Sequence, residues 1–375
     1  LLALDRAGSA GFGGILIAAL LIPHVVAAPA VGLITDRARR PQWVIAVAAL
    51  GLALGLAIAA LTVGRAPGAL PIVVLLAGGA CGPALLGGLS SQLGSLVPAS
   101  SLPRGFGFDS LSYNVSGIAG PALAGLLSGL ATPAVATFVL AASAAGGAIV
   151  LATLPLERRP GHGGECRTPR LRDGTLVLLR DRVLGVVTAV SCVGQLGAGA
   201  LPVVTAVLCG RLDDPAATGW LLTAVALGGL LGSLFWTWRP LPAPRAPLVV
   251  TLTSVGIGLP LGLVACSPSP SAAALLFALS GFFLGPFAGA LFTTRQDHSP
   301  PRLRAQVFSL GAGLKTTSAA IGAALAGTVA HLPIATQLLL VAACPVVAGV
   351  VGTLLLPYAH PRRARPTVAA TGPGL

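Results

Sequence analysis

The stretch Gly32-Leu-Ile-Thr-Asp-Arg-Ala-Arg-Arg40 separates two long apolar runs. In the first, residues 10–34, the only side chain that can carry charge is His24. A run of this length can cross the hydrocarbon core of a bilayer, about 30 Å thick, as one helix. The second run, residues 44–63, is charge-free. Because the connection is short, the two helices must be antiparallel, and its arginines predict that it lies on the cytoplasmic side.

Gly32, Asp36, Arg37 and Arg40 have the spacing G-x-x-x-D-R-x-x-R between two spans, which resembles the loop between helices two and three of the major facilitator superfamily. The resemblance implies that the glycine allows close helix approach and that the acid contacts the cytoplasmic end of helix eleven. It also implies that the arginines join a conformational latch on that side. A carboxylate at a helix N-terminus gains about 0.3 to 1 kcal/mol. The alternative is a basic loop that sets topology and nothing more.

The composition is that of an integral membrane protein, with 55% hydrophobic residues, 9% charged residues and a mean hydropathy of +0.90. The net charge of +13 does not predict a nucleic-acid partner. All basic residues except Arg6, Arg65, Arg211 and Lys315 fall on the predicted cytoplasmic side. This asymmetry follows the positive-inside rule. The six cysteines form no C-x-x-C pair, so neither a metal site nor a cofactor is expected.

We predict an all-α polytopic membrane protein of two pseudo-symmetric six-helix halves, with about eleven complete spans present. The helical halves are residues 1–154 and 183–358, joined by a cytoplasmic linker, 155–182, and followed by a cytoplasmic tail, 359–375. The chain contains no methionine, and its first residues read as the end of an apolar segment. We therefore expect the first helix to be truncated. Loops after even-numbered helices are expected to be cytoplasmic.

The halves retain sequence symmetry. Gly120-Pro-Ala-Leu-Ala-Gly125 matches Gly322-Ala-Ala-Leu-Ala-Gly327, and Phe106 then aligns with Phe308. Such internal repeats are typical of this transporter fold. In the second half, Gly232 is the counterpart of Gly32, but Trp236 stands where the acid should be. The second latch is therefore expected to be degenerate.

A glycine and proline pattern formed by Gly117, Gly120, Pro121 and Gly125 resembles the fifth-helix motif of the superfamily's exporters. Small residues permit tight helix packing, and a proline removes a backbone hydrogen bond and can bend the helix. The pattern favours export over uptake. The arginine that the family often carries in its fourth helix, linked to proton coupling, is absent here.

Lys315, the only lysine, lies about nine residues inside a predicted span. A cation at that depth costs about 2.5 to 3.5 kcal/mol and by default marks a functional position. The repeat alignment pairs it with Tyr113, so the two side chains are expected at similar depths across a central cavity. We expect Lys315 to bind an anionic substrate group or a carboxylate. The alternative is that its ammonium group extends to the cytoplasmic interface.

Asp109 is the one acid at the start of a span. It could exchange protons, pair with Arg40 or Arg104, or simply favour a helix N-terminus. His24 could contact substrate or a proton, although a lone histidine in a helix more often satisfies a hydrogen bond. Further substrate or coupling candidates, each equally able to bond a neighbouring helix, are Asn114 and Gln195.

These features predict a secondary transporter of the cell membrane that works by alternating access and exports small lipophilic or organic compounds. The expected partners are a small-molecule substrate, the lipid bilayer and, as candidate coupling ions, protons. A monomer is expected. We find no sequence basis for enzyme activity. The alternatives are an uptake transporter of the same fold and a degenerate membrane protein without transport activity.

Overall fold

The computed structural model describes residues 2–154, 156, 169–211, 217–267 and 269–356, and these residues form helices and no strands. The first part of the chain contains α1 (Leu2–Ala7), α2 (Ala10–Leu21), α3 (Pro23–Arg37), α4 (Pro41–Thr62), α5 (Ala69–Gly79), the π-helical turn η1 (Ala84–Gly88), α6 (Leu89–Ser91), α7 (Leu93–Leu96), α8 (Leu102–Leu130) and α9 (Pro133–Thr153). The second part contains α10 (Asp173–Arg180), α11 (Arg182–Arg211), α12 (Ala217–Trp238), α13 (Ala246–Leu263), α14 (Pro270–His298), α15 (Arg304–Thr328) and α16 (Ile334–Leu355).

Within the described residues, nine helical segments are long and apolar enough to cross a membrane. One of them joins α2 and α3, which are interrupted at Pro23, and another runs from α5 to α7. Two further helices, α8 with 29 residues and α15 with 25, have sufficient length but fall outside those nine. The nine segments together with α8 and α15 coincide with the eleven predicted spans, although α8 and α15 qualify by length alone. A helix satisfies its own backbone hydrogen bonds, as a spanning segment in lipid must.

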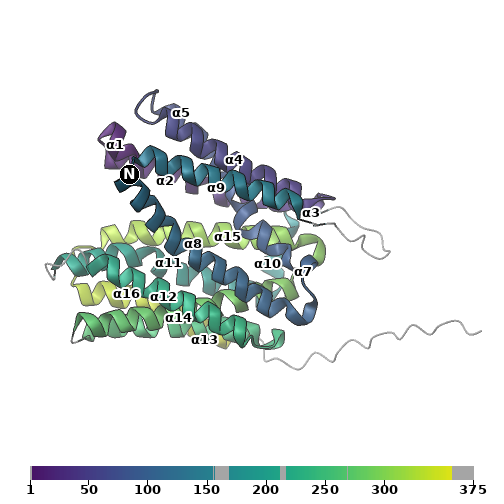
Figure 1. The fold of residues 1–375 in the computed structure, drawn as a ribbon. Helices are drawn as coiled ribbons and strands as arrows, with labels where there is room; N and C mark the ends of the chain where they lie inside the picture. Colours follow the sequence, from purple (N-terminus) through teal and green to yellow (C-terminus); the bar gives the residue numbers. More distant parts are fainter. Residues whose placement is uncertain (1, 155, 157–168, 212–216, 268, 357–375) are drawn as a thin grey trace, which may run out of the picture.

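Two groups of helices pack against each other. In the first group α4 contacts α9 and α5, and in the second α12 contacts α14, α13 contacts α16, and α11 contacts both α15 and α16. Between the groups, α3 packs on α15, and α8 packs on α12 and α14. In Figure 1 the first group lies above the second, and α8 reaches from one to the other. The predicted tail, 359–375, and residues 157–168 of the linker lie outside the described residues.

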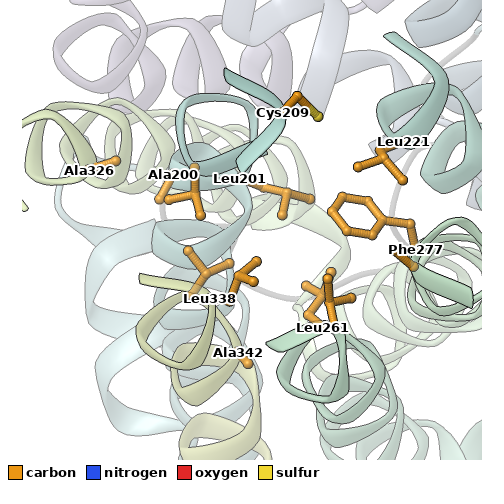
Figure 2. Close-up of a cluster of buried hydrophobic side chains, with 13 residues drawn as sticks. Ala200, Leu201, Cys209, Leu221, Leu261, Phe277, Ala326, Leu338 and Ala342 are labelled. Carbon is orange, nitrogen blue, oxygen red and sulfur yellow. The ribbon is translucent and has the colours of Figure 1, made fainter. Parts of the chain in front are cut away.

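The largest buried apolar cluster lies in the second group (Figure 2). Side chains from α11, α12, α13, α14 and α16 converge there around Phe277, which is fully buried. Many large apolar side chains elsewhere are exposed. Examples are Val26 and Leu354, which are 76% and 78% exposed. Such exposure suits helices whose outer faces meet lipid rather than water.

One end of the helix bundle carries α10, and we call it the linker end. The ends of α3, α12 and α14 lie there, as do the beginnings of α8, α11 and α15, because successive spans alternate in direction. Asp181 joins elements at this end. Its carboxylate accepts a hydrogen bond from Leu184 N at the start of α11 (2.9 Å) and pairs with His298 Nδ1 at the end of α14 (3.1 Å).

Candidate functional site

A polar contact between the halves joins the end of α3 to the start of α15. Asp36 Oδ1 accepts a hydrogen bond from Ala305 N and Asp36 Oδ2 accepts one from Gln306 N, both at 2.9 Å. These amides belong to the first turn of α15, whose N–H groups lack partners within the helix. A Cβ atom on Gly32 would lie 2.5 Å from Gln306 Cα, so glycine is what allows this approach. Asp36 thus caps a helix of the other half.

The linker joins the same contact. Arg37 Nε donates to Pro169 O at 3.0 Å. The buried side chain of Gln306 accepts a hydrogen bond from Gly174 N at 2.8 Å and donates one to Arg170 O at 3.3 Å. The sequence analysis did not identify Gln306, because nothing local distinguishes it from other polar residues at the start of a helix. Arg40, which the motif includes, is exposed at the start of α4.

A second contact between the halves joins the start of α8 to the end of α12. Trp236 Nε1 donates to Pro103 O at 3.1 Å, and Arg104 Nε donates to Thr237 O at 3.2 Å. Deeper along α8, Asn114 Nδ2 donates to Ser233 Oγ at 2.9 Å. Asn114, expected as a substrate candidate, therefore connects the two halves in this structure. The tryptophan in the position of the missing acid also makes a contact between the halves, with a donor in place of an acceptor.

An aromatic layer lies between these two contacts. The ring centroids of Phe106, Phe292 and Phe308 are 5.9 to 6.2 Å apart, and the ring of Tyr113 is 6.1 Å from that of Phe292. Phe106 and Phe308, which the repeat alignment pairs, stack on each other from opposite halves. Aromatic pairs at such distances stabilise the folded protein by about 0.5 to 1.5 kcal/mol beyond the contribution of the area that they bury. We call this layer and the two polar contacts the linker-end gate.

Arg295 is a functional candidate that the sequence analysis missed. We expected it on the cytoplasmic side, just beyond the end of a span at Thr294. The predicted end of that span is wrong, because α14 continues to His298 and Arg295 is 1% exposed within it. Its Nε and Nη2 atoms have no hydrogen-bond partner in the described part of the chain. In the sequence, Arg295 is the first charged residue after an apolar run, a pattern that predicts the end of the helix there. A charged residue by itself does not end a helix. Side chains on a helix point toward its N-terminus, which here means away from the linker end.

Lys315 and Tyr113 lie near Arg295, and Asp109 lies beside Tyr113. Lys315 is partly buried on α15 and near enough to Arg295 for their charges to repel. Tyr113 interacts electrostatically with both Asp109 and Arg295, and its hydroxyl lies 3.1 Å from Ser90 Oγ. Asp109 Oδ2 is buried and has no hydrogen-bond partner among the described residues. The expected pairing of Asp109 with Arg40 or Arg104 is not observed, because Asp109 lies deeper, beside Ser90.

The remaining predicted residues lie apart from the gate. His24 is buried in α3 and its ring occupies the space where a Cβ atom on Gly82 would lie. Gln195 is partly buried on α11. On α8, Cβ atoms placed on the three motif glycines would meet no atom of another element within 4 Å, and the motif proline is exposed. These motif residues are Gly117, Gly120, Gly125 and Pro121.

The arrangement combines a closed end with unpaired charges beside it. Hydrogen bonds and ring contacts join the halves at the linker end. No group of three or more metal-ligating side chains occurs within the described ranges.

Comparison with known proteins identifies the family. A family model described as Major Facilitator Superfamily matches residues 1–211, more than half of the chain. The chain is 29% identical over 260 residues to y4rN, an uncharacterized MFS-type transporter of Sinorhizobium fredii, across 66% of this chain and 62% of that protein. It is 32% identical over 195 residues to the class G tetracycline resistance protein of Vibrio anguillarum, across 50% of this chain and 47% of that protein.

Thus the chain matches about six tenths of the length of the first relative and about half of the second. The crystal structure of a bacterial homologue of the iron transporter ferroportin in an outward-facing state has the same fold. Its TM-score is 0.70 over 94% of this chain and 92% of that chain, at 16% sequence identity. The fold, the contact between α3 and α15 and the family match agree, and this chain belongs to the Major Facilitator Superfamily.

Proposed function

We propose that this chain moves a small organic molecule across a membrane by alternating access, with export as the direction. The observation that carries the proposal is the Asp36 carboxylate of one half capping the first turn of α15 in the other half. This contact closes one end of the bundle with interactions that are readily exchanged for water. The family consists of transporters and not enzymes, which agrees with the absence of any catalytic motif in the sequence.

The linker end is the cytoplasmic end in this proposal. Arg37, Arg104, Arg182 and Arg239 lie at or beside helix termini there, and basic residues flanking spans face the cytoplasm. With the linker end closed, the described conformation corresponds to an outward-open carrier. The protein resides in the cell membrane as a monomer, and protons are the proposed coupling ions. Breaking the contacts at Asp36 then opens the cytoplasmic side.

Export is supported by two features. The glycine and proline motif on α8 resembles that of exporters, and one relative is a tetracycline resistance protein. The partly buried rings of Phe292 and Tyr113 beside the gate suit a lipophilic cargo, because apolar surface removed from water contributes about 25 cal/mol per Å². We therefore propose a lipophilic organic compound as the exported molecule.

The test is efflux of tetracycline and a panel of fluorescent lipophilic dyes from cells that express the chain. The variant is Asp36→Asn. Asparagine keeps one acceptor oxygen, but its NH₂ group replaces the other, so one of the two hydrogen bonds from Ala305 N and Gln306 N is lost. The matched control is Asp5→Asn, which changes an exposed acid on α1, outside the gate. All proteins are compared at equal amounts in the membrane.

We expect energy-dependent efflux from the wild type and Asp5→Asn and its loss in Asp36→Asn. Dye accumulation in place of loss would show uptake and overturn the proposed direction. Absence of any transport by the wild type, with the protein present in the membrane, would support the alternative of a degenerate membrane protein.

A further inference from the structure

Arg295 is a buried cation that its surroundings do not neutralise. Two of its three guanidinium nitrogens lack hydrogen-bond partners in the described residues. Its guanidinium lies across α15 at Gly311, where an added Cβ atom would be 2.3 Å from Nη2. Unpaired charges buried away from water are strongly unfavourable. A group that compensates Arg295 at some stage of the protein's cycle would explain why the cost is tolerated.

Lys315 directs a second positive charge to the same place. It is four residues after Gly311 and therefore on the same face of α15. Helices α14 and α15 run in opposite directions, and side chains point toward the N-terminus of their own helix. The side chain of Arg295 thus extends away from the linker end, and that of Lys315 extends toward it. The two cations converge and repel each other.

Acidic residues nearby do not balance these charges. The one ion pair recorded within the described ranges, between Asp181 and His298, involves neither cation. Asp297 is two residues from Arg295, and residues at that spacing do not face each other on a helix. Asp109 lies on the opposite half beside Tyr113, and its carboxylate forms no ion pair with either cation among the described residues. The two cations therefore leave an excess of positive charge.

We propose that Arg295 and Lys315 bind the anionic group of an organic substrate, a carboxylate or a sulfonate. Arginine suits such groups because its planar fork donates parallel hydrogen bonds to two oxygens. Phe292 lies three residues before Arg295 on the same face of α14, and the ring of Tyr113 lies 6.1 Å from its ring at a tilted angle. These rings would hold the apolar part of the molecule. This inference rests on the proposed function and specifies its cargo as an aromatic or otherwise lipophilic anion.

The different exposure of the two cations suggests an order of binding. Lys315 is partly exposed, whereas Arg295 is covered in this conformation. The anion meets Lys315 first, and the guanidinium engages it as the halves rearrange. Arg295 lies on the same helix face as Phe292 of the aromatic layer, so its movement toward the anion is coupled to the gate.

The test measures thermal unfolding of the purified full chain in detergent with two probes, benzenesulfonate and the neutral benzenesulfonamide. A ligand that binds the folded state raises the unfolding temperature. We expect saturable stabilisation by the sulfonate alone. Arg295→Gln and Lys315→Gln should each weaken its apparent affinity at least tenfold. Arg302→Gln, which removes an exposed arginine at the linker end, should leave the affinity unchanged.

Two further variants keep the test decisive if Arg295→Gln does not fold. Gly311→Ala retains both charges but occupies the place of the guanidinium, so it should weaken binding of the sulfonate. Asp109→Asn removes the carboxylate beside Tyr113 and keeps both cations, so binding of the sulfonate should be retained. Loss of binding in Asp109→Asn would contradict the assignment of the anion site to Arg295 and Lys315.

Equal stabilisation by both probes, no stabilisation of the wild type by the sulfonate, or full affinity in Arg295→Gln, Lys315→Gln and Gly311→Ala would each overturn the inference. The inference and the proposed function fail in different ways. Dye efflux by a wild-type protein that the sulfonate does not stabilise removes the anion site and keeps the exporter. Specific binding of the sulfonate without any transport keeps the anion site and removes the exporter.

Discussion

The helices α8 and α15 occupy equivalent positions in the two halves, yet they are held differently. At the linker end, α15 receives the Asp36 carboxylate on two backbone amides, whereas α8 presents one carbonyl, that of Pro103, to Trp236. Toward the other end, a Cβ atom on Gly322 of α15 would lie 1.9 Å from Leu196 O of α11. The aligned Gly120 of α8 meets no other element within 4 Å.

This difference shows that sequence symmetry does not imply equal interactions. A charged acceptor and a neutral donor can occupy the same position in the repeat, and both can bind the first turn of a helix in the opposite half. The charged contact is the stronger of the two, because hydrogen bonds to charged groups contribute about 1.5 to 3 kcal/mol and neutral ones about 1 kcal/mol. We therefore expect the gate to depend more on α15 than on α8.

The largest effect is expected from Gly322→Leu. Its side chain would collide with the backbone of α11 at Leu196 O, and such overpacking costs about 3 kcal/mol. The purified variant should unfold at a clearly lower temperature than the wild type, or fail to accumulate as a monodisperse protein in detergent. A variant as stable as the wild type would show that the contact between α11 and α15 yields easily.

Asp36→Ala should have the next largest effect, on the gate rather than on folding. The variant lacks the carboxylate and so loses two hydrogen bonds. The two backbone amides can form hydrogen bonds to water instead when the halves separate. The closed state should lose about 2 kcal/mol, roughly a thirtyfold shift in the equilibrium. The measurement is alkylation of a cysteine introduced at the fully buried Ser309, near Pro83 across the gate, in a background without native cysteines. Unchanged alkylation would mean that the cap does not hold the gate.

Trp236→Phe, on α12, provides the matched change at the contact with α8. It keeps the aromatic bulk and removes only the hydrogen bond to Pro103 O. The loss of one neutral hydrogen bond is about 1 kcal/mol, so the same cysteine should react roughly fivefold faster. If Trp236→Phe opens the gate as much as Asp36→Ala does, the two contacts are equivalent in energy and the proposed asymmetry is wrong.

Much of this fold follows from local features of the sequence. Charge-free runs mark the spans, and the motif around Asp36 indicates the acid that contacts α15. The features that sequence reasoning missed arise from tertiary contacts. The buried position of Gln306 depends on the linker folding back onto α15. Arg295 lies inside a helix because α14 continues beyond its apolar run, and Asn114 bonds to Ser233 of the other half.

Gly120→Leu is expected to have the smallest effect. It tests directly whether the aligned positions on α8 and α15 differ in packing. The position faces no other described element, and replacing glycine by leucine within a helix gains less than about 1 kcal/mol in propensity. The unfolding temperature should therefore stay close to that of the wild type, unlike that of Gly322→Leu. A loss of stability similar to that of Gly322→Leu would show that this face of α8 is covered in the folded protein, as α11 covers the equivalent face of α15. The exporter-like motif on α8 would then be a packing surface in both halves.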